Sequence, residues 1–381
     1  MRQADSGHLV VALLLLLQAG PASFTAGTFD PLVLDGIRRG AFPGAALVIG
    51  RRDTILFAKG YGRLTWSATS PAASVDSTLW DLASLTKVVA TTPALMLLVE
   101  RGKVDLDAPV VRYVAEFNGP GTAAITVRHL LTHTSGLRGT LPLRQAADSA
   151  AALRMVLTTT PLVPPGTRMV YSDLNAILLG EIVRRTSGLP LDQFVAREFI
   201  IPLGLEQQML FRPAKRLERR IAPSGVWRGH AIAGVVNDPN AARLGGVAGH
   251  AGLFATAAAV ARFAQFMLSE GERLLKPETV RQFTRIAVPA RRGSSARTLG
   301  WEAVPTGEEV SSAGSLFGAR SYGHTGWTGT SLWIDPDRGL FVLLLTNRSY
   351  AQAGGRRGTF TILKEVRGHV ADAAARASDA R

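Results

Sequence analysis

Strand-like segments stand at both ends of the 381-residue chain, and helical segments fill the stretch between them. Residues 44–62 predict two strands joined by a polar turn at 51–53, and segments 298–304, 322–336 and 340–348 predict further strands. Strands from both termini can bury their apolar faces together in one sheet. We therefore expect an α/β fold of the α+β type: a central antiparallel sheet built from both chain ends and flanked by helices, with an inserted, mostly helical subdomain.

The same pattern divides the chain into a leader and two subdomains. Residues 1–26 contain an apolar stretch from Leu9 to Leu17 followed by small residues, which is typical of an export signal peptide. We assign residues 27–75 and 295–381 to a sheet-containing subdomain and residues 76–294 to the helical subdomain, the two forming one domain.

The leader determines the expected location of the protein. Its apolar stretch is too short to span a bilayer comfortably, so cleavage is favoured over anchoring. We expect a periplasmic or secreted protein of a bacterial cell envelope, with no membrane span after cleavage. Retention of the leader as an anchor is the alternative.

Apolar spacing predicts several helices in the middle of the chain. The first ends at Gly102 and contains Pro93, which should kink it or leave a carbonyl free. The second, ITVRHLLTHTSGL, stops at Gly136, and the third, YSDLNAILLGEIVRRTSG, stops at Gly188. Residues 196–245 are rich in arginine, glycine and proline, so we expect irregular structure there.

Composition excludes several classes of function. The net charge is +14, but no run of five or six like charges and no zinc-finger or RNA-binding signature occurs, so we expect no nucleic-acid partner. The absence of cysteine excludes disulfides, thiolate metal sites and a cysteine nucleophile. His129 and His133 have metal-ligand spacing, but no zinc-protease glutamate follows, and phosphate-loop and dinucleotide motifs are missing. We expect neither metal nor cofactor.

Ser84 and Lys87 lie three positions apart in the mostly apolar segment LWDLASLTKVVATT. On a helix the two side chains share a face, and a serine in the first turn points toward the positive end of the helix dipole. Lys87 could accept the proton of Ser84 only as a neutral amine, so we expect burial and cationic neighbours to lower its pKa. The structural alternative is Ser84 as an ordinary helix N-cap.

Tyr171 precedes a predicted helix, so its phenol could project over a cleft and carry a proton to a leaving group. Tyrosines in such positions are more often core aromatics with a satisfied hydroxyl. His250, between glycines in GGVAGHAGLFAT, could line the same cleft or support the surroundings of the nucleophile.

The segment YGHTGWTGTSLWID has paired glycines, Gly326 and Gly329, in a strand pattern, which indicates close approach of another backbone or a ligand. The amide of Trp327 could then form an oxyanion hole with the amide of Ser84. His324 would head the strand and donate toward a substrate carboxylate or carbonyl. A sheet bend with a surface histidine is the alternative.

Taken in this order, the three motifs resemble the serine β-lactamase and penicillin-binding-protein superfamily, which combines Ser-x-x-Lys, Tyr-Ser-Asn (or Ser-Asp-Asn) and Lys-Thr-Gly. LASLTK, RHLLTHTSGL, YSDLNAILLG, GGVAGHAGLFAT and GHTGWTGTSLWIDP are similar to its class C β-lactamase-related branch, which also holds D-alanyl-D-alanine carboxypeptidases, D-aminopeptidases and esterases. The resemblance covers roughly residues 35–350. It implies a β-lactamase/transpeptidase-like fold.

The resemblance also implies roles for single residues. Ser84 would be the acylated nucleophile, Lys87 its proton acceptor and Tyr171 the partner base or acid, with the strand motif His324, Thr325 and Gly326 contacting substrate. His324 replaces the usual lysine, so a substrate carboxylate would be held by a weaker, pH-dependent charge.

Two further positions depart from the family pattern. Asp173 replaces the asparagine that contacts the acyl-side amide, and Trp327 narrows the cleft. Together with His324, these departures disfavour efficient β-lactam hydrolysis and leave acyl transfer untouched.

The sequence therefore predicts an exported, monomeric serine hydrolase that forms an acyl-enzyme on amide or ester substrates. The expected substrates are D-amino-acid peptides of the cell wall, including peptidoglycan itself, or small esters. A non-hydrolytic peptidoglycan- or β-lactam-binding module of the same fold is the alternative.

Overall fold

The computed structural model describes residues 24–227, 229–291, 295–304, 311–351 and 358–380. The expected signal peptide, residues 1–26, lies almost wholly outside them. In the part of the chain that is described, no helix combines the length and apolar character needed to cross a membrane.

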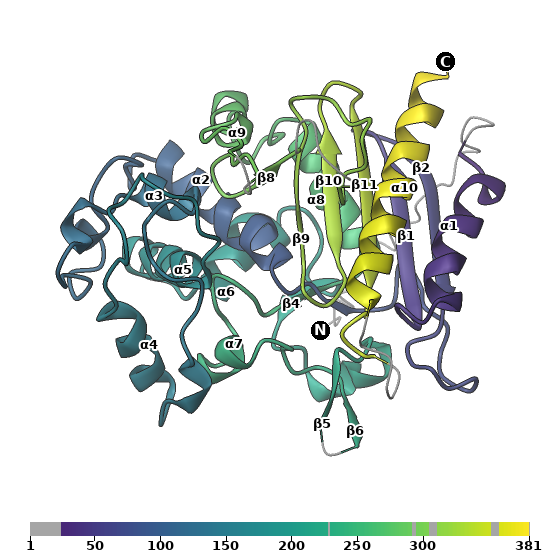
Figure 1. The fold of residues 1–381 in the computed structure, drawn as a ribbon, viewed down its shortest axis with the longest axis horizontal. Coiled ribbons are helices and arrows are strands. Elements are labelled where there is room, and N and C mark those ends of the chain that lie inside the picture. The colour runs from purple at the N-terminus through teal and green to yellow at the C-terminus, as the bar shows by residue number, and fades with distance from the viewer. Residues whose placement is uncertain (1–23, 228, 292–294, 305–310, 352–357, 381) are drawn as a thin grey trace, which may run out of the picture.

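A six-stranded antiparallel sheet forms one half of the molecule, as the sequence predicts (Figure 1). In spatial order its strands are β2 (Ile55–Gly62), β1 (Gly44–Gly50), β11 (Leu340–Thr346), β10 (Ser331–Asp335), β9 (Tyr322–Thr325) and β8 (Glu302–Ala303). The N-terminal hairpin β1–β2 joins the C-terminal strands through β1 and β11, in a register that opposes Leu47 to Leu344. The sheet is therefore built from both ends of the chain.

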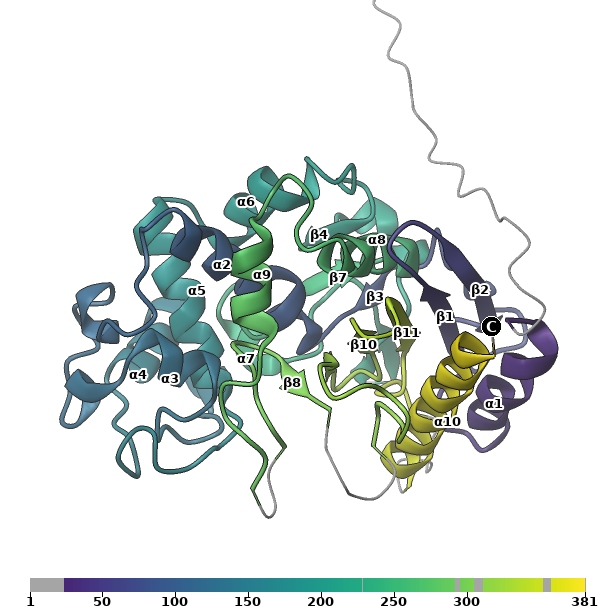
Figure 2. The ribbon, with the colours of Figure 1, turned by 90° about the horizontal axis from the view of Figure 1, so that it is seen from above.

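Helices cover both faces of this sheet (Figure 2). The helices α1 (Ala26–Arg38) and α10 (Thr359–Asp379) pack against each other and on one face, and α8 (Ala257–Leu268) packs on the other. Every residue of β1 and β11 is buried, which explains why their sequences are continuous apolar runs instead of alternating ones.

The second half of the molecule is mostly helical (Figure 1). Its helices are α2 (Thr92–Glu100), α3 (Val127–Leu131), α4 (Ser149–Leu157), α5 (Asp173–Ser187), α6 (Leu191–Val195), α7 (Pro239–Arg243) and α9 (Pro277–Thr284). It also contains a three-stranded sheet, in the order β3 (Trp80–Asp81), β7 (Leu253–Ala255) and β4 (Met209–Phe211), and a hairpin of β5 (Gly225–Trp227) and β6 (His230–Ile232). The stretch 196–245, expected to be irregular, thus carries several short elements.

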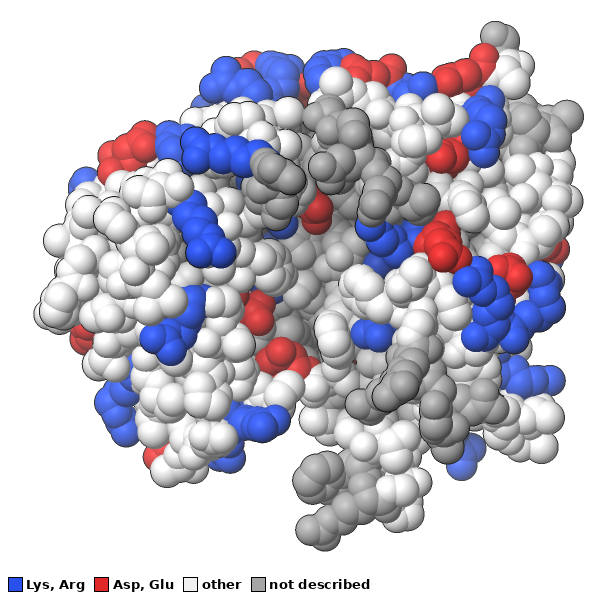
Figure 3. All heavy atoms as spheres, in the orientation of Figure 1, with Lys and Arg blue, Asp and Glu red and all other residues white. Residues whose placement is uncertain are grey.

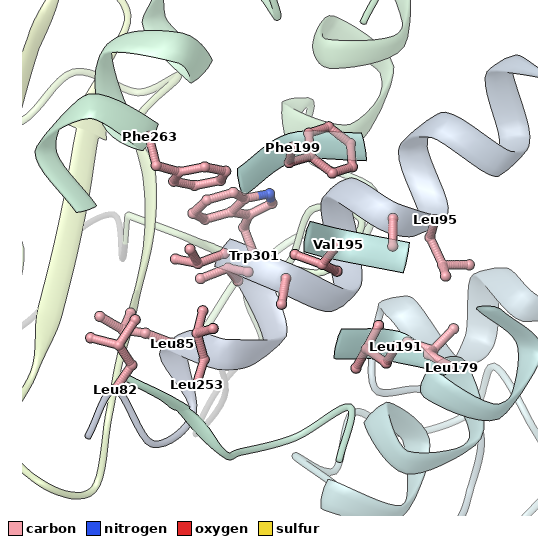
Figure 4. Packing of buried hydrophobic residues seen from close by; sticks show 14 of the residues in the cluster. Leu82, Leu85, Leu95, Leu179, Leu191, Val195, Phe199, Leu253, Phe263 and Trp301 are labelled. Carbon is pink, nitrogen blue, oxygen red and sulfur yellow. The ribbon is translucent and has the colours of Figure 1, made fainter. Parts of the chain in front are cut away.

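One hydrophobic cluster joins the two halves. It runs from residues of β1, β10 and β11 into α2, α5, α6 and α8. Figure 4 shows its centre, where the ring of Trp301 stacks on Phe263 with centroids 6.4 Å apart. Trp301 precedes β8 and Phe263 belongs to α8. Phe266, one turn further along α8, lies 6.1 Å from the ring of Phe199 in the helical half, so the core holds the sheet edge and the helical half in a fixed relation.

Two helices differ in detail from the expectation. The helix expected to reach Gly136 ends at Leu131, because His133 adopts a left-handed backbone conformation with φ of 58°. The irregularity expected at Pro93 is a π-helix over Lys87–Thr91, after which proline occupies the first turn of α2, where its missing N–H costs nothing. Lys87 therefore begins the unusual turn.

Candidate active site

The segment before Ser84 is held in a strained conformation by a buried carboxylate. Ala83 has a positive φ of 48°, which is unfavourable for a residue with a Cβ. The Asp81 carboxylate accepts hydrogen bonds from the backbone amides of Ala83 (2.9 Å) and Asn237 (2.6 Å). Burial raises the pKa of Asp81 to about 6. Ser84 follows directly, at the start of the helical turn.

Lys87 is the centre of the site. Its side chain is 4% exposed, and its ammonium nitrogen lies 2.9 Å from Ser84 Oγ, 2.8 Å from Asp173 Oδ1 and 3.2 Å from the carbonyl oxygen of His250. These three acceptors use all three N–H donors of a protonated lysine. No backbone amide of the described residues donates to the Ser84 hydroxyl, so the structure does not support the N-cap alternative for Ser84.

The pKa of Lys87 is raised, so the expectation that it is lowered is wrong. Burial does lower the pKa, but the carboxylate of Asp173 and the neighbouring Tyr171 raise it by more. The expectation failed because it considered burial and cationic neighbours and overlooked that Asp173, 86 positions later, would reach the amine. In the resting site Lys87 is an ammonium ion paired with a carboxylate.

Tyr171 lies over this ion pair, immediately before α5. Its ring centroid is 5.0 Å from Lys87 Nζ and 4.7 Å from the ring of His133, and its hydroxyl is buried without a hydrogen-bond partner in the described structure. His133 Nδ1 accepts a hydrogen bond from the amide of Ser172 (3.2 Å), which fixes the entry into α5. His133 is therefore a support for Tyr171.

The metal alternative for the two histidines finds no support in the structure. His129 instead closes a capping box at the start of α3, where its Nδ1 accepts a hydrogen bond from the amide of Thr126. Within the described residues, no group of three or more possible ligand side chains could hold a metal ion.

His324 is buried within β9 and carries no charge at neutral pH. Burial lowers its pKa to about 3, with the charges of Arg297 and Lys87 contributing. Its Nδ1 lies 2.7 Å from the carbonyl oxygen of Thr325, so Nδ1 carries the proton and Nε2 is an acceptor. The expected roles of His324, a pH-dependent cation and a donor toward a substrate carboxylate or carbonyl, do not fit this environment.

The turn after β9 is attached to the nucleophile segment. Thr328 and Thr330 donate side-chain hydrogen bonds to the carbonyls of Asp81 (2.7 Å) and Leu82 (2.9 Å). A Cβ on Gly326 would lie 2.6 Å from the Leu82 carbonyl oxygen, which confirms the close backbone approach that its glycines predicted.

This attachment places two free donors near the nucleophile. Among the described residues, neither the amide of Ser84 nor that of Trp327 donates to any acceptor, so both remain available to an oxyanion.

Arg297 is a site residue that the sequence reasoning missed. Its guanidinium carbon lies 5.6 Å from the Tyr171 ring centroid, and the residue is 5% exposed. Its backbone extends the sheet edge beyond β8, pairing with Val288 and Glu302. No local motif distinguishes this arginine from the many others, and only the pairing across the sheet edge brings it to Tyr171.

His250 supports the site without facing the nucleophile. Its carbonyl accepts from Lys87, and its Nε2 lies 3.0 Å from Asp238 Oδ1. Burial alone would raise the pKa of Asp238, but the hydrogen bond to His250 and the charge of His250 help to lower it to about 2. The site thus unites Ser84, Lys87, Tyr171, Asp173 and His324, with the Trp327 side chain exposed at one end.

The two halves of the molecule meet at a hollow in the surface (Figure 3). Both acidic and basic side chains lie along its walls. A serine beside a lysine, two free amide donors and a buried tyrosine between two structural halves can carry out nucleophilic acyl transfer.

Comparison with known proteins agrees with this chemistry. The Beta-lactamase family matches residues 29–366. A protein of Escherichia coli O157:H7 named a D-alanyl-D-alanine carboxypeptidase is 29% identical over 348 residues, covering 81% of this chain and 79% of that protein.

Two solved structures share the fold. A penicillin-binding protein homologue from Caulobacter crescentus has a TM-score of 0.74 at 20% identity, covering 93% of this chain and 99% of that one. EstCE1, described as a hydrolase with promiscuous acyltransferase activity, has a TM-score of 0.73 at 22% identity, covering 92% and 98%. The fold is thus β-lactamase/transpeptidase-like, and the chain belongs to the beta-lactamase family.

Proposed function

We propose that the protein is an exported serine hydrolase that forms an acyl-enzyme at Ser84, acting on D-amino-acid peptides of the cell wall or on small esters. The observation that carries the proposal is the position of Lys87 Nζ, within hydrogen-bonding distance of both Ser84 Oγ and Asp173 Oδ1. The relatives named D-alanyl-D-alanine carboxypeptidases support the peptide substrate and a location in the cell envelope.

The ion pair requires a proton relay. As Ser84 Oγ attacks the substrate carbonyl, its proton passes to Lys87 while Lys87 passes a proton to Asp173, so the lysine stays an ammonium ion and the carboxylate becomes neutral. The amides of Ser84 and Trp327 stabilise the oxyanion that forms on the carbonyl oxygen. Asp173 is thus the final proton acceptor of the attack.

Collapse of the tetrahedral intermediate breaks the bond to the leaving group. The Tyr171 hydroxyl, which is buried and unpartnered in the described structure, donates its proton to the leaving nitrogen or oxygen. The proton held on Asp173 then returns through Lys87 to the phenolate, which restores the resting charges. Water attacks the acyl-enzyme along the same path in reverse.

Arg297 favours substrates that carry a carboxylate. In the described structure its Nε and Nη1 have no hydrogen-bond partner, and its nearest anion, Glu302, is 3.9 Å away, which is too long for a hydrogen bond. A buried guanidinium cannot lose its proton and is costly without a partner. A carboxylate on the leaving group, next to Tyr171, would supply the missing acceptors and replace the charge that His324 does not provide.

The nucleophile is tested by intact-mass measurement with a fluorescent penicillin and a short-chain aryl ester. We expect a covalent adduct or ester turnover in the wild type and neither in Ser84→Ala or Lys87→Ala, with rate losses of at least about a thousandfold. An adduct that forms and never releases would favour the binding-module alternative. Turnover that survives Ser84→Ala would contradict the proposal.

The relay is tested by the pH dependence of kcat/KM in Asp173→Asn. Without the carboxylate, burial lowers the pKa of Lys87 and the neutral amine becomes the only proton acceptor. We expect kcat/KM at pH 7 to fall by about 100-fold or more and to rise with pH as Lys87 deprotonates. Asp192→Asn, the same change on α6 outside the site, is the control. A faster variant at pH 7 would show that Asp173 only inhibits Lys87.

The carboxylate contact is tested with N-acetyl-D-alanyl-D-alanine and its C-terminal amide. For Arg297→Gln we expect KM for the carboxylate form to rise by about tenfold or more, because charged hydrogen bonds are lost. Turnover of the amide should change little, and Arg262→Gln on α8 controls for net charge. Equal effects on both substrates would assign Arg297 a purely structural role.

A further inference from the structure

A second hollow adjoins the oxyanion turn on the side of Trp327. It has a volume of about 560 Å³ and lies between the β5–β6 hairpin, the turn after β9 and the start of α10. Trp327, Phe360, Val226 and Ile232 supply its apolar walls, and Asn237 and Arg348 lie beside them. Three separate elements of the fold thus converge on one groove.

Large apolar side chains are unusually exposed around this groove. Trp327 is 64% exposed, Phe360 50% and Val226 47%. Single exposed apolar residues are common on protein surfaces, but a cluster around one hollow is typical of a ligand site. The exposure is therefore a feature of the groove as a whole.

The aromatic walls are held in place. The guanidinium carbon of Arg348 lies 4.9 Å from the ring centroid of Trp327 and 5.4 Å from that of Phe360, between the two rings. Arg348 also donates a hydrogen bond to the Trp327 carbonyl, and Arg367 of α10 donates one to the Thr330 carbonyl (2.8 Å). A groove with fixed walls loses little entropy on binding an apolar group.

Two residues of the groove also belong to the surroundings of the nucleophile. Trp327 contributes its side chain to the groove and its unpaired backbone amide to the proposed oxyanion hole. Asn237 lines the groove, and its backbone amide donates a hydrogen bond to the Asp81 carboxylate. The same carboxylate accepts a hydrogen bond from the backbone amide of Ala83. The groove therefore adjoins the proposed oxyanion hole through the backbone of Trp327.

We propose that this groove binds an apolar acyl chain of the substrate, so that the enzyme prefers acyl groups with an extended hydrocarbon or aromatic part. The inference rests on the proposed function and adds its acyl specificity. Neither Tyr171 nor Arg297, which the proposed function assigns to the leaving group, lines the groove. The acyl side is then the one that faces Trp327.

The proposal is tested with 4-nitrophenyl acetate and 4-nitrophenyl hexanoate, which share a leaving group. Each methylene that leaves water contributes about fourfold to kcat/KM. We therefore expect kcat/KM for the hexanoate to exceed that for the acetate by about tenfold or more. Phe360→Ala on α10 and Trp327→Ala, which keeps the backbone amide, should each reduce the hexanoate-to-acetate ratio of kcat/KM several-fold, with the ratio taken within each variant. Ile286→Ala, at an exposed apolar residue outside the groove, is the matched control.

Binding to Ser84→Ala separates this proposal from the failure of turnover. Calorimetry should show N-hexanoyl-D-alanine binding at least tenfold more tightly than N-acetyl-D-alanine, with the difference reduced in Ser84→Ala/Trp327→Ala. Equal binding of the two ligands, or binding of neither, would overturn the groove assignment. If the enzyme instead prefers acetate esters whose alcohol carries the six-carbon chain, the groove binds the leaving group. That result would overturn its assignment to the acyl chain.

Discussion

The site depends on one buried ion pair, between the Lys87 ammonium and the Asp173 carboxylate, with Ser84 as a third partner. A buried charge is tolerated only when it is paired and hydrogen-bonded, and Lys87 meets both conditions. The pair keeps Lys87, the neighbour of the nucleophile Ser84, protonated. Under the proposed function, the proton of Ser84 therefore travels through the lysine to the carboxylate.

The fold brings the members of this pair together from distant parts of the chain. Ser84 and Lys87 follow β3, Asp173 begins α5, and the Trp327 amide comes from the turn after β9. The hydrophobic cluster around Trp301 keeps the sheet edge and the helical half in contact. Threonine hydrogen bonds from the β9–β10 turn to Asp81 and Leu82 then hold the turn that carries the Trp327 amide against the segment that precedes Ser84.

Much of this arrangement is predictable from the sequence, and the exceptions have physical causes. The continuous apolar runs of β1 and β11 indicate central strands, and the Ser84–Lys87 spacing indicates a shared helix face. The electrostatics were not predictable, because the raised pKa of Lys87 and the neutral state of His324 depend on side chains that only the tertiary structure brings near. Arg297 was missed for the same reason.

The substrate features inferred from the two ends of the site are complementary. Arg297 and Tyr171 favour a carboxylate on the leaving group, and the groove at Trp327 and Phe360 favours an apolar acyl chain. Together they describe an acylated amino acid or a related ester. In the described structure the neutral His324 Nε2 is buried without a hydrogen-bond partner, so it could accept a hydrogen bond from the amide N–H of such a substrate.

The protonation state of Lys87 tests the account most directly. The chain has only six lysines, so labelling lysine with carbon-13 at Cε allows the Lys87 signal to be assigned with Lys87→Arg and followed by NMR against pH. We expect Lys87 to stay protonated past the ordinary lysine pKa of about 10.4 and to titrate at lower pH in Asp173→Asn. A wild-type Lys87 that loses its proton near neutral pH would contradict the relay and restore the lysine as a simple base.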